Sequence, residues 1–436
     1  MRPSNLRTAC FLAVAACALQ AAWAGTAPIR TEDQALSWDL SPPLPMDAHF
    51  GATLAMSESS PGSGVYKAFI GAPGAGAARQ LEISLDEPIW GGNFTLLPTT
   101  EQPMPVAYGF FPVHARLDSG GATTSIVRSD TGAVLVAGLD GGPVRSLAIH
   151  RFMPGDGQPE VFFLAVGQPA YFGDAGRVRI YERNGSGTWT LAETFVGGFP
   201  SRLGTALAAD GLTVAAGAPG RGDNGAVHVF VRAGEGWIEL QVIDSPATGQ
   251  TEAEFGAAVA LDGSHLAVGS PMLDRNTPPP ALTNGGGVHV YDALTFPFLE
   301  FQLQATLRPP GLTHHDWFGT SVDLRPATTG AVELVAGAPG DDTGANNGGA
   351  VYRYLRTGEP HASSWRPVAE LVNSQPVDLE QLGTTVGLEK IGVLAGAPFG
   401  QFGAGATSGL VLFFDARIFL DGFESGDLSA WELVFP

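Results

Sequence analysis

The stretch LGTALAADGLTVAAGAPGRGDNGAVHVFVRAGEGWIELQVI, residues 203–243, contains one complete copy of the pattern on which the fold depends. It has a glycine-led opening, an apolar run that ends in Gly-Ala-Pro, an alternating stretch, and a last stretch that begins with Trp. Alternation of apolar and polar residues is typical of β-strands, and Asp-Gly pairs and glycines between such runs are typical of turns. The segment therefore predicts four short strands joined by tight turns.

The same four-part pattern recurs along most of the chain, at intervals of about 50–65 residues. Glycine-led openings stand elsewhere as FGATLAM at 50, GPVRSLAI at 142, FGAAVAL at 255, FGTSVDL at 318 and LGTTVGL at 382. Gly-Ala-Pro phrases or close variants follow as FIGAPG at 69, LAVGQP at 164, LAVGSP at 266, LVAGAPG at 334 and VLAGAPFG at 393. Such repeats are typical of propeller blades.

We therefore predict an all-β fold, a β-propeller of four-stranded antiparallel blades. The first two strands of each repeat carry Gly and Ala, which suit the crowded centre, and the outer strands carry Tyr, Phe and Trp. Residues 105–141 lack the phrases but hold enough apolar runs for one degenerate blade. This predicts seven blades, with six as the alternative.

The ends of the chain predict how the ring closes. The last repeat lacks its aromatic-led fourth strand, and ALSWDLS at 35–41 precedes Phe50-Gly51 as WIELQVI at 237–243 precedes Phe255-Gly256. We expect this N-terminal outer strand to complete the C-terminal blade, because that pairing removes exposed sheet edges.

The paired Phe-Gly and Gly-Ala-Pro phrases resemble FG-GAP repeats, the blades of the integrin α-subunit propeller and of many secreted bacterial proteins. The resemblance covers residues 34 to about 417, and it implies that partners bind on one face. In integrins, loops between the first two strands often carry D-x-D-x-D-G-x-x-D, which supplies the many oxygens that Ca²⁺ needs. Here those loops carry single carboxylates, Asp210 and Asp262. We therefore expect neither structural calcium nor another cofactor.

The first 24 residues are typical of a secretory signal, with Arg2 and Arg7, an apolar core, and Ala22-Trp23-Ala24 before the cleavage point. The alternative is a lipobox ending at Cys17, which would then carry a lipid. We divide the chain into a signal peptide (1–24), a propeller (25–417) and a tail (418–436). The expected location is extracellular, periplasmic or on the outer cell surface. Both cysteines lie in the signal, so we expect no disulfide.

The charge balance excludes several classes of partner. The formal net charge is −20 at pH 7, and it becomes −22 without the two signal arginines. Nucleic acid and anionic lipid require a basic face, so neither is expected as a partner. After the signal no run reaches the ~20 apolar residues of a membrane helix. We expect a soluble monomer without a transmembrane segment.

Two motifs have both a functional and a structural interpretation. Arg221-Gly222-Asp223 is the tripeptide that integrins bind, yet the parallel loop GAPGDDTGANNGGAVY at 337–352 has no Arg. A turn is therefore the simpler interpretation. His314-His315-Asp316 could ligate a metal, but adjacent side chains diverge in an extended segment. Acids also recur at this place in the repeat, as Asp47, Glu254, Asp316 and Glu380.

Topology predicts where a ligand would bind. Loops that lead into the first strand and loops that join the second strand to the third emerge at the same end of the ring. That end gathers eight polar candidates: Arg221, Asp223, Glu254, His314, His315, Asp316, Asp341 and Asp342. We predict an exported, non-enzymatic, adhesion-type propeller that binds a protein or glycan there.

One alternative is a secreted hydrolase or lyase, which needs three or more convergent titratable groups in the central channel. Another is one module of an envelope assembly. No nucleophile, metalloprotease or phosphate-loop motif is present. The tail, IFLDGFESGDLSAWELVFP at 418–436, matches no repeat phrase, and we interpret it as an extension or as a recognition tail for export or surface attachment.

Overall fold

The computed structural model describes residues 34–35, 52–58, 63–72, 77–84, 95–98, 106–108, 111–118, 123–153, 160–274, 282–294, 300–327, 331–357, 364–400 and 409–415. These residues form seven four-stranded antiparallel sheets and one helical turn. In the described part of the chain, no helix has the length and apolar character needed to cross a bilayer. The predicted signal, the predicted tail and Asp47 lie outside the described residues.

The first three sheets follow one another along the chain, each built from four consecutive strands. The first contains β2 (Thr53–Glu58), β3 (Val65–Ala72), β4 (Ala77–Ser84) and β5 (Thr95–Pro98). The second contains β6 (Val106–Tyr108), β7 (Pro112–Leu117), β8 (Thr124–Arg128) and β9 (Val134–Leu139). The third contains β10 (Ser146–Phe152), β11 (Val161–Gln168), β12 (Arg177–Arg183) and β13 (Trp189–Val196), with α2 (Tyr171–Asp174) between β11 and β12.

The remaining four sheets continue the pattern. The fourth contains β14 (Leu207–Asp210), β15 (Thr213–Ala218), β16 (Ala226–Ala233) and β17 (Gly236–Asp244). The fifth contains β18 (Ala258–Asp262), β19 (His265–Ser270), β20 (Gly287–Leu294) and β21 (Glu300–Leu307). The sixth contains β22 (Ser321–Pro326), β23 (Val332–Ala338), β24 (Ala350–Thr357) and β25 (Ser364–Leu371). The seventh contains β26 (Thr385–Glu389), β27 (Gly392–Ala397), β28 (Leu410–Asp415) and β1 (Gln34–Ala35).

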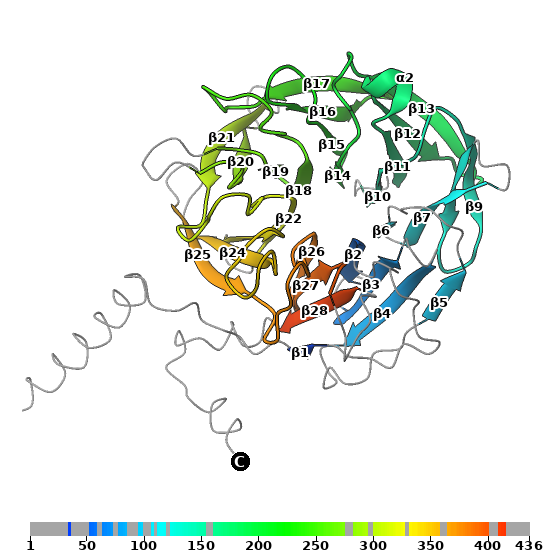
Figure 1. Cartoon of the computed structure of the whole chain (residues 1–436). Coiled ribbons are helices and arrows are strands. Elements are labelled where there is room, and N and C mark those ends of the chain that lie inside the picture. Colours follow the sequence, from blue (N-terminus) through cyan, green and yellow to red (C-terminus); the bar gives the residue numbers. More distant parts are fainter. Residues whose placement is uncertain are drawn as a thin grey trace, which may run out of the picture.

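The sheets stand around a central opening, with the first strand of each sheet nearest to it (Figure 1). This arrangement fits a seven-bladed propeller, so seven blades rather than six is the correct alternative. The degenerate repeat at 105–141 does form a sheet, and the glycine-led and Gly-Ala-Pro phrases form the first and second strands as predicted.

The last sheet is completed by the N-terminal strand. Gln34 lies opposite Phe413 and Ala35 lies opposite Leu412, in antiparallel pairing. The predicted pairing of an N-terminal strand with the last sheet is confirmed at residues 34–35, and residues 36–41 of the predicted strand lie outside the described part of the structure.

Glycine pairs explain why the two phrases recur together. A Cβ added to Gly217 of one blade would lie 1.9 Å from the carbonyl oxygen of Gly256 in the next. The same modification at Gly337 would place a Cβ 1.9 Å from the Gly383 oxygen. Neighbouring blades therefore meet backbone to backbone near the centre, where a side chain does not fit.

The hydrophobic core lies between blades. One cluster joins Leu334 and Tyr352 of the sixth blade to Val288 and Phe318, and similar clusters fill other boundaries. Charged groups between blades are paired. Both carboxylate oxygens of Asp292 accept hydrogen bonds from Arg356, each at 2.7 Å, and both side chains are buried.

Candidate functional site

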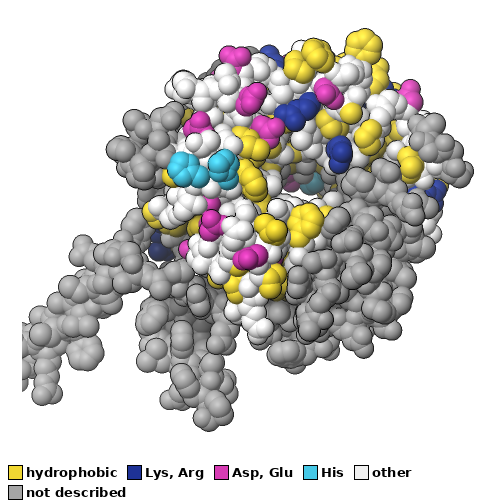
Figure 2. All heavy atoms as spheres, in the orientation of Figure 1, with side chains coloured by type: hydrophobic (Ala, Val, Ile, Leu, Met, Phe, Trp, Pro, Cys, Tyr) yellow, Lys and Arg dark blue, Asp and Glu magenta, His cyan; other side chains and the backbone are white. Residues whose placement is uncertain are grey.

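The loops at one end of the ring lock neighbouring blades together. Single parallel bridges join the loop after the second strand of one blade to the loop before the first strand of the next: Gly176 to Leu203, Gly225 to Phe255, Gly286 to Phe318, and Gly349 to Leu382. The two loop sets predicted to share one end therefore lie together. We call this end the interlocked face. Figure 2 shows it, with acidic side chains scattered around a central opening whose rim includes hydrophobic side chains.

The tripeptide Arg221-Gly222-Asp223 lies on this face and forms a turn. The backbone N–H of Gly225 donates to the carbonyl of Arg221 at 2.9 Å, and Gly222 has a φ of +59°. The guanidinium of Arg221 pairs with the carboxylate of Asp244, whereas the side chain of Asp223 is exposed. The tripeptide thus has the turn structure that the parallel loop predicted.

Asp316 and Asp341 do not belong to the exposed surface. Asp316 is 1% exposed, and its carboxylate accepts hydrogen bonds from the N–H and the hydroxyl of Thr313. Asp341 is 2% exposed and accepts the hydroxyl of Tyr352 at 2.6 Å. Burial, with the nearby charges of Asp341 and Asp342, raises the pKa of Asp316. Both carboxylates hold loops in place, so the prediction that they present themselves to a ligand is corrected.

Glu254 and Asp342 are more accessible. Glu254 accepts a hydrogen bond from Arg202 at 3.0 Å, across the boundary between two blades. Asp342 is exposed and accepts the N–H of Asn347 at 2.7 Å. Each carboxylate keeps an accessible side, so both remain candidates for ligand contact.

His314 and His315 are both exposed, with ring centroids 6.4 Å apart. Nδ1 of His314 accepts the N–H of Thr283 at 3.0 Å, which occupies one of its two ring nitrogens. Among the residues that the structure describes, no three His, Asp, Glu or Cys side chains are grouped so that they could hold a metal ion. The pair therefore forms a polar patch on the interlocked face.

The two carboxylates from the loops compared with calcium sites lie one blade apart. Asp210 accepts the N–H of Gly263 at 2.7 Å, so it fastens the turn of the neighbouring blade. Burial, together with the charge of Asp210, raises the pKa of Asp262 to about 6. Asp210 therefore connects the turn of its own blade to the turn of the next.

The middle of the central channel is lined by the first strands of the blades in its described part. Its wall consists chiefly of Ala, Leu, Ile and Val from the first strands, with Asp323 as its one carboxylate. Asp323 accepts the N–H groups of Leu324 at 2.9 Å and Leu388 at 2.7 Å, and burial raises its pKa to about 7. The charge of Asp262 adds to this shift, and the charge of Asp323 in turn adds to the raised pKa of Glu389, so these three carboxyl groups interact.

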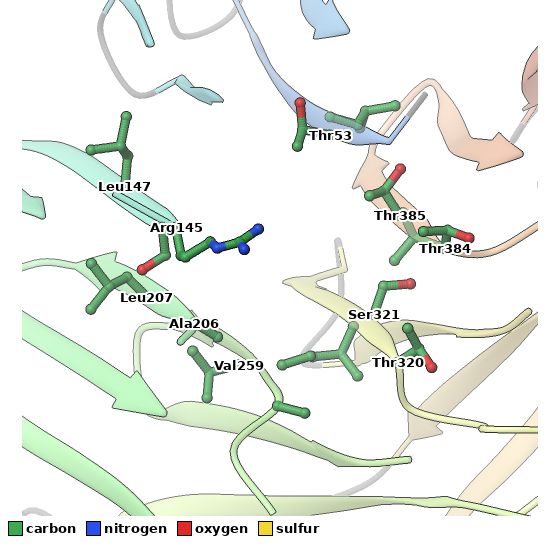
Figure 3. Close-up of a pocket in the computed structure, with 16 residues that line it drawn as sticks. Thr53, Arg145, Leu147, Ala206, Leu207, Val259, Thr320, Ser321, Thr384 and Thr385 are labelled. Atoms are coloured by element: carbon green, nitrogen blue, oxygen red, sulfur yellow. The ribbon is translucent and has the colours of Figure 1, made fainter. Parts of the chain in front are cut away.

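The mouth of the channel on the interlocked face has a different lining, which the sequence analysis missed. Arg145, immediately before β10, projects into an opening of about 250 Å³ bordered by Thr and Ser residues (Figure 3). Arg145 stands one residue before Ser146, which lies opposite the phrase glycine Gly167. In four other repeats the equivalent residue is Ala52, Ala257, Thr320 or Thr384. A column-by-column comparison of the repeats would have found this exception.

Two exposed aromatic side chains were also missed. Phe172 is 82% exposed in α2, and Phe199 is 77% exposed in the loop before the fourth blade. The loops that carry them are fastened together, since Arg202 N–H donates to Asp174 O at 2.8 Å and the Ser201 hydroxyl donates to Ala175 O at 2.6 Å. Both residues lie outside the repeat phrases, so the repeats gave no signal for them.

No protein-family model matches the sequence, and no curated protein is significantly similar to it. Solved structures that it resembles include an Aleuria aurantia lectin mutant in complex with alpha-methyl-L-fucoside, at 12% identity and a TM-score of 0.41, covering 77% of this chain and 99% of that chain. Another is a Bacteroides uniformis protein provisionally assigned as a 6-phosphogluconolactonase, at 16% identity and a TM-score of 0.45, covering 75% and 86%. Likenesses at this level carry no argument about ligand or activity.

Proposed function

We propose that this chain is an exported, FG-GAP-type propeller that binds a protein or glycan on its interlocked face without catalysing a reaction. One observation supports this proposal. The loops of the interlocked face are held together by hydrogen bonds, and yet they expose large aromatic side chains. Phe172 has a φ of +49°, a backbone conformation that is unfavourable for a bulky residue. An exposed Phe in such a loop does not stabilise the fold through burial of its side chain. This favours a role for Phe172 in contact with a partner.

Preorganised loops suit recognition because little conformational entropy is lost when a ligand binds. Aromatic side chains supply most contact energy in many interfaces, while the surrounding polar groups set orientation. Phe172 and Phe199 would provide the contact energy. Asp223, Asp342 and the His314-His315 patch would orient the ligand. Export rests on the signal-like residues 1–24.

The test is a binding screen of residues 25–436 against glycan arrays and against exported proteins of the native host. The loop variant carries Phe172→Asn and Phe199→Ser, since Asn tolerates a positive φ. The control variant carries Ile238→Ser and Leu303→Ser, which alter two other exposed hydrophobic side chains (49% and 44% exposed) on the outer strands β17 and β21.

We expect at least one saturable ligand, an affinity about tenfold weaker for the loop variant, and an unchanged affinity for the control variant. Melting curves check that both variants fold. The absence of any saturable ligand, or equal losses in both variants, would rule out recognition by the interlocked face.

A further inference from the structure

Among the described residues that line the mouth of the central channel, Arg145 is the one charged side chain. Arg145 is exposed and projects into the opening (Figure 3), and among the described residues its guanidinium makes no ion pair or hydrogen bond. Its backbone is fixed, because its N–H donates to the carbonyl of Gly167 at 2.9 Å. Other arginines of the same face are paired: Arg177 with Asp140, Arg202 with Glu254, and Arg221 with Asp244.

No carboxylate neutralises this guanidinium locally. Arg145 is the only charged residue among the described residues that line the mouth, although the whole chain has a net charge of −20. An unpaired guanidinium in such surroundings favours a group that carries negative charge and two acceptor oxygens, because the planar fork binds a carboxylate through two parallel hydrogen bonds.

Backbone carbonyls hold four hydroxyl groups of the rim. Each of four rim hydroxyls donates its proton to a backbone carbonyl at 2.7–2.8 Å: Ser146 to Gly204, Thr320 to Trp317, Ser321 to Gly383, and Thr384 to Gln381. A hydroxyl has one proton to donate and two lone pairs. These oxygens can therefore only accept further hydrogen bonds, and a ligand must bring the donors.

The lining of the mouth also includes the apolar side chains of Leu147, Leu207 and Val259. The opening of about 250 Å³ is smaller than the roughly 300–1,000 Å³ of sites for drug-sized ligands. It therefore suits a single ring rather than an extended molecule, and a ring with some apolar surface.

We propose that the channel mouth is a subsite for one uronic acid unit of an acidic glycan, with its carboxylate on Arg145 and its hydroxyls donating to the Ser and Thr oxygens. A neutral sugar leaves the guanidinium without an acceptor pair of opposite charge, and sulfate or phosphate brings few or no donors for the rim. A carboxylated polyol matches both features at once. This inference rests on the proposed binding function and names its ligand class.

Calorimetric titration of residues 25–436 tests the subsite. The probes are galacturonic, glucuronic and mannuronic acid, and the trimers of galacturonic and of mannuronic acid. The methyl ester of each probe keeps the hydroxyl groups but lacks the negative charge. Sodium sulfate and a tripeptide with a free terminal carboxylate test for a simple anion site and for a peptide ligand. The variants are Arg145→Gln and Arg145→Lys, and the control is Arg366→Gln, which changes an exposed arginine on β25.

We expect at least one uronate to bind saturably, and its ester to bind about tenfold more weakly or worse. Arg145→Gln should produce the same loss, Arg145→Lys a partial loss because it keeps charge without the fork, and Arg366→Gln none.

Equal binding of acid and ester, unchanged binding by Arg145→Gln, or preference for sulfate or the tripeptide would overturn the subsite. If the array screen finds another ligand while every uronate fails, the subsite is wrong and the binding function stands. If nothing binds in either experiment, both are wrong.

Discussion

Adjacent residues of the same type have different roles on the interlocked face because their burial differs. Asp341 is buried and holds the hydroxyl of Tyr352, while Asp342 next to it is exposed. The sequence places both residues in one loop but does not predict which of them is buried. The burial of each carboxylate depends on how the next blade packs over the loop. The same reason explains why Asp316 was predicted at the correct end of the ring but with the wrong accessibility.

Glu389 provides a test at this scale through pH. Burial, with the charge of Asp323 as the next cause, raises the pKa of Glu389 from 4.5 to about 7. Between these values the folded state keeps a proton that the unfolded state releases, so the free energy of unfolding falls as pH rises, and the loss is complete above pH 7. Glu389→Gln should remove this loss and be more stable than the parent at pH 8, by on the order of 2 kcal/mol, with no difference at pH 4.

Urea unfolding at pH 4, 6 and 8 measures the effect. Glu235→Gln, which changes an exposed residue between β16 and β17, is the matched control and should follow the parent at every pH. If the free energy of unfolding changed with pH in the same way for Glu389→Gln and the parent, the pKa of Glu389 would not be raised as its surroundings imply.

At the scale of the elements, most of the strand positions were predicted from the repeat phrases. They located the first and second strands because glycine is required where blades meet, and that requirement is a steric one visible in sequence. The second blade lacks the phrases, yet its apolar runs still marked four strands. The pairing of β1 with β28 was predicted from the missing fourth strand of the last repeat, but its register was not, since a strand that closes a ring is selected by its partner rather than by its own pattern.

Gly217→Ala tests the steric requirement. The new Cβ would lie 1.9 Å from the backbone oxygen of Gly256, so the fourth and fifth blades must separate or the backbone must shift. We expect the variant to lose about 2 kcal/mol or more of stability in urea unfolding. Gly236→Ala, where a Cβ meets nothing within 4 Å, should change stability little. Similar stability for the two variants would contradict the proposed role of the phrases.

At the scale of the whole molecule, the seventh sheet has its four strands by Asp415. Deleting residues 420–436 should therefore leave the melting temperature within a few degrees and change only where the protein is found. Scanning calorimetry and cell fractionation measure the two effects. Deleting residues 412–436 instead removes most of β28 and should prevent folding. A protein lacking only 420–436 that failed to fold would show the tail to be an integral strand.

The closure of the ring has a mechanical consequence. Two residue pairs, Gln34 with Phe413 and Ala35 with Leu412, join β1 to the rest of the seventh sheet. A tension that draws residues 34 and 415 apart would load the pairing of β1 with β28 first, while the other six sheets, each made of consecutive strands, stay unloaded until it opens. Stretching should therefore separate β1 from β28 and open the ring at the seventh sheet before any other sheet unfolds.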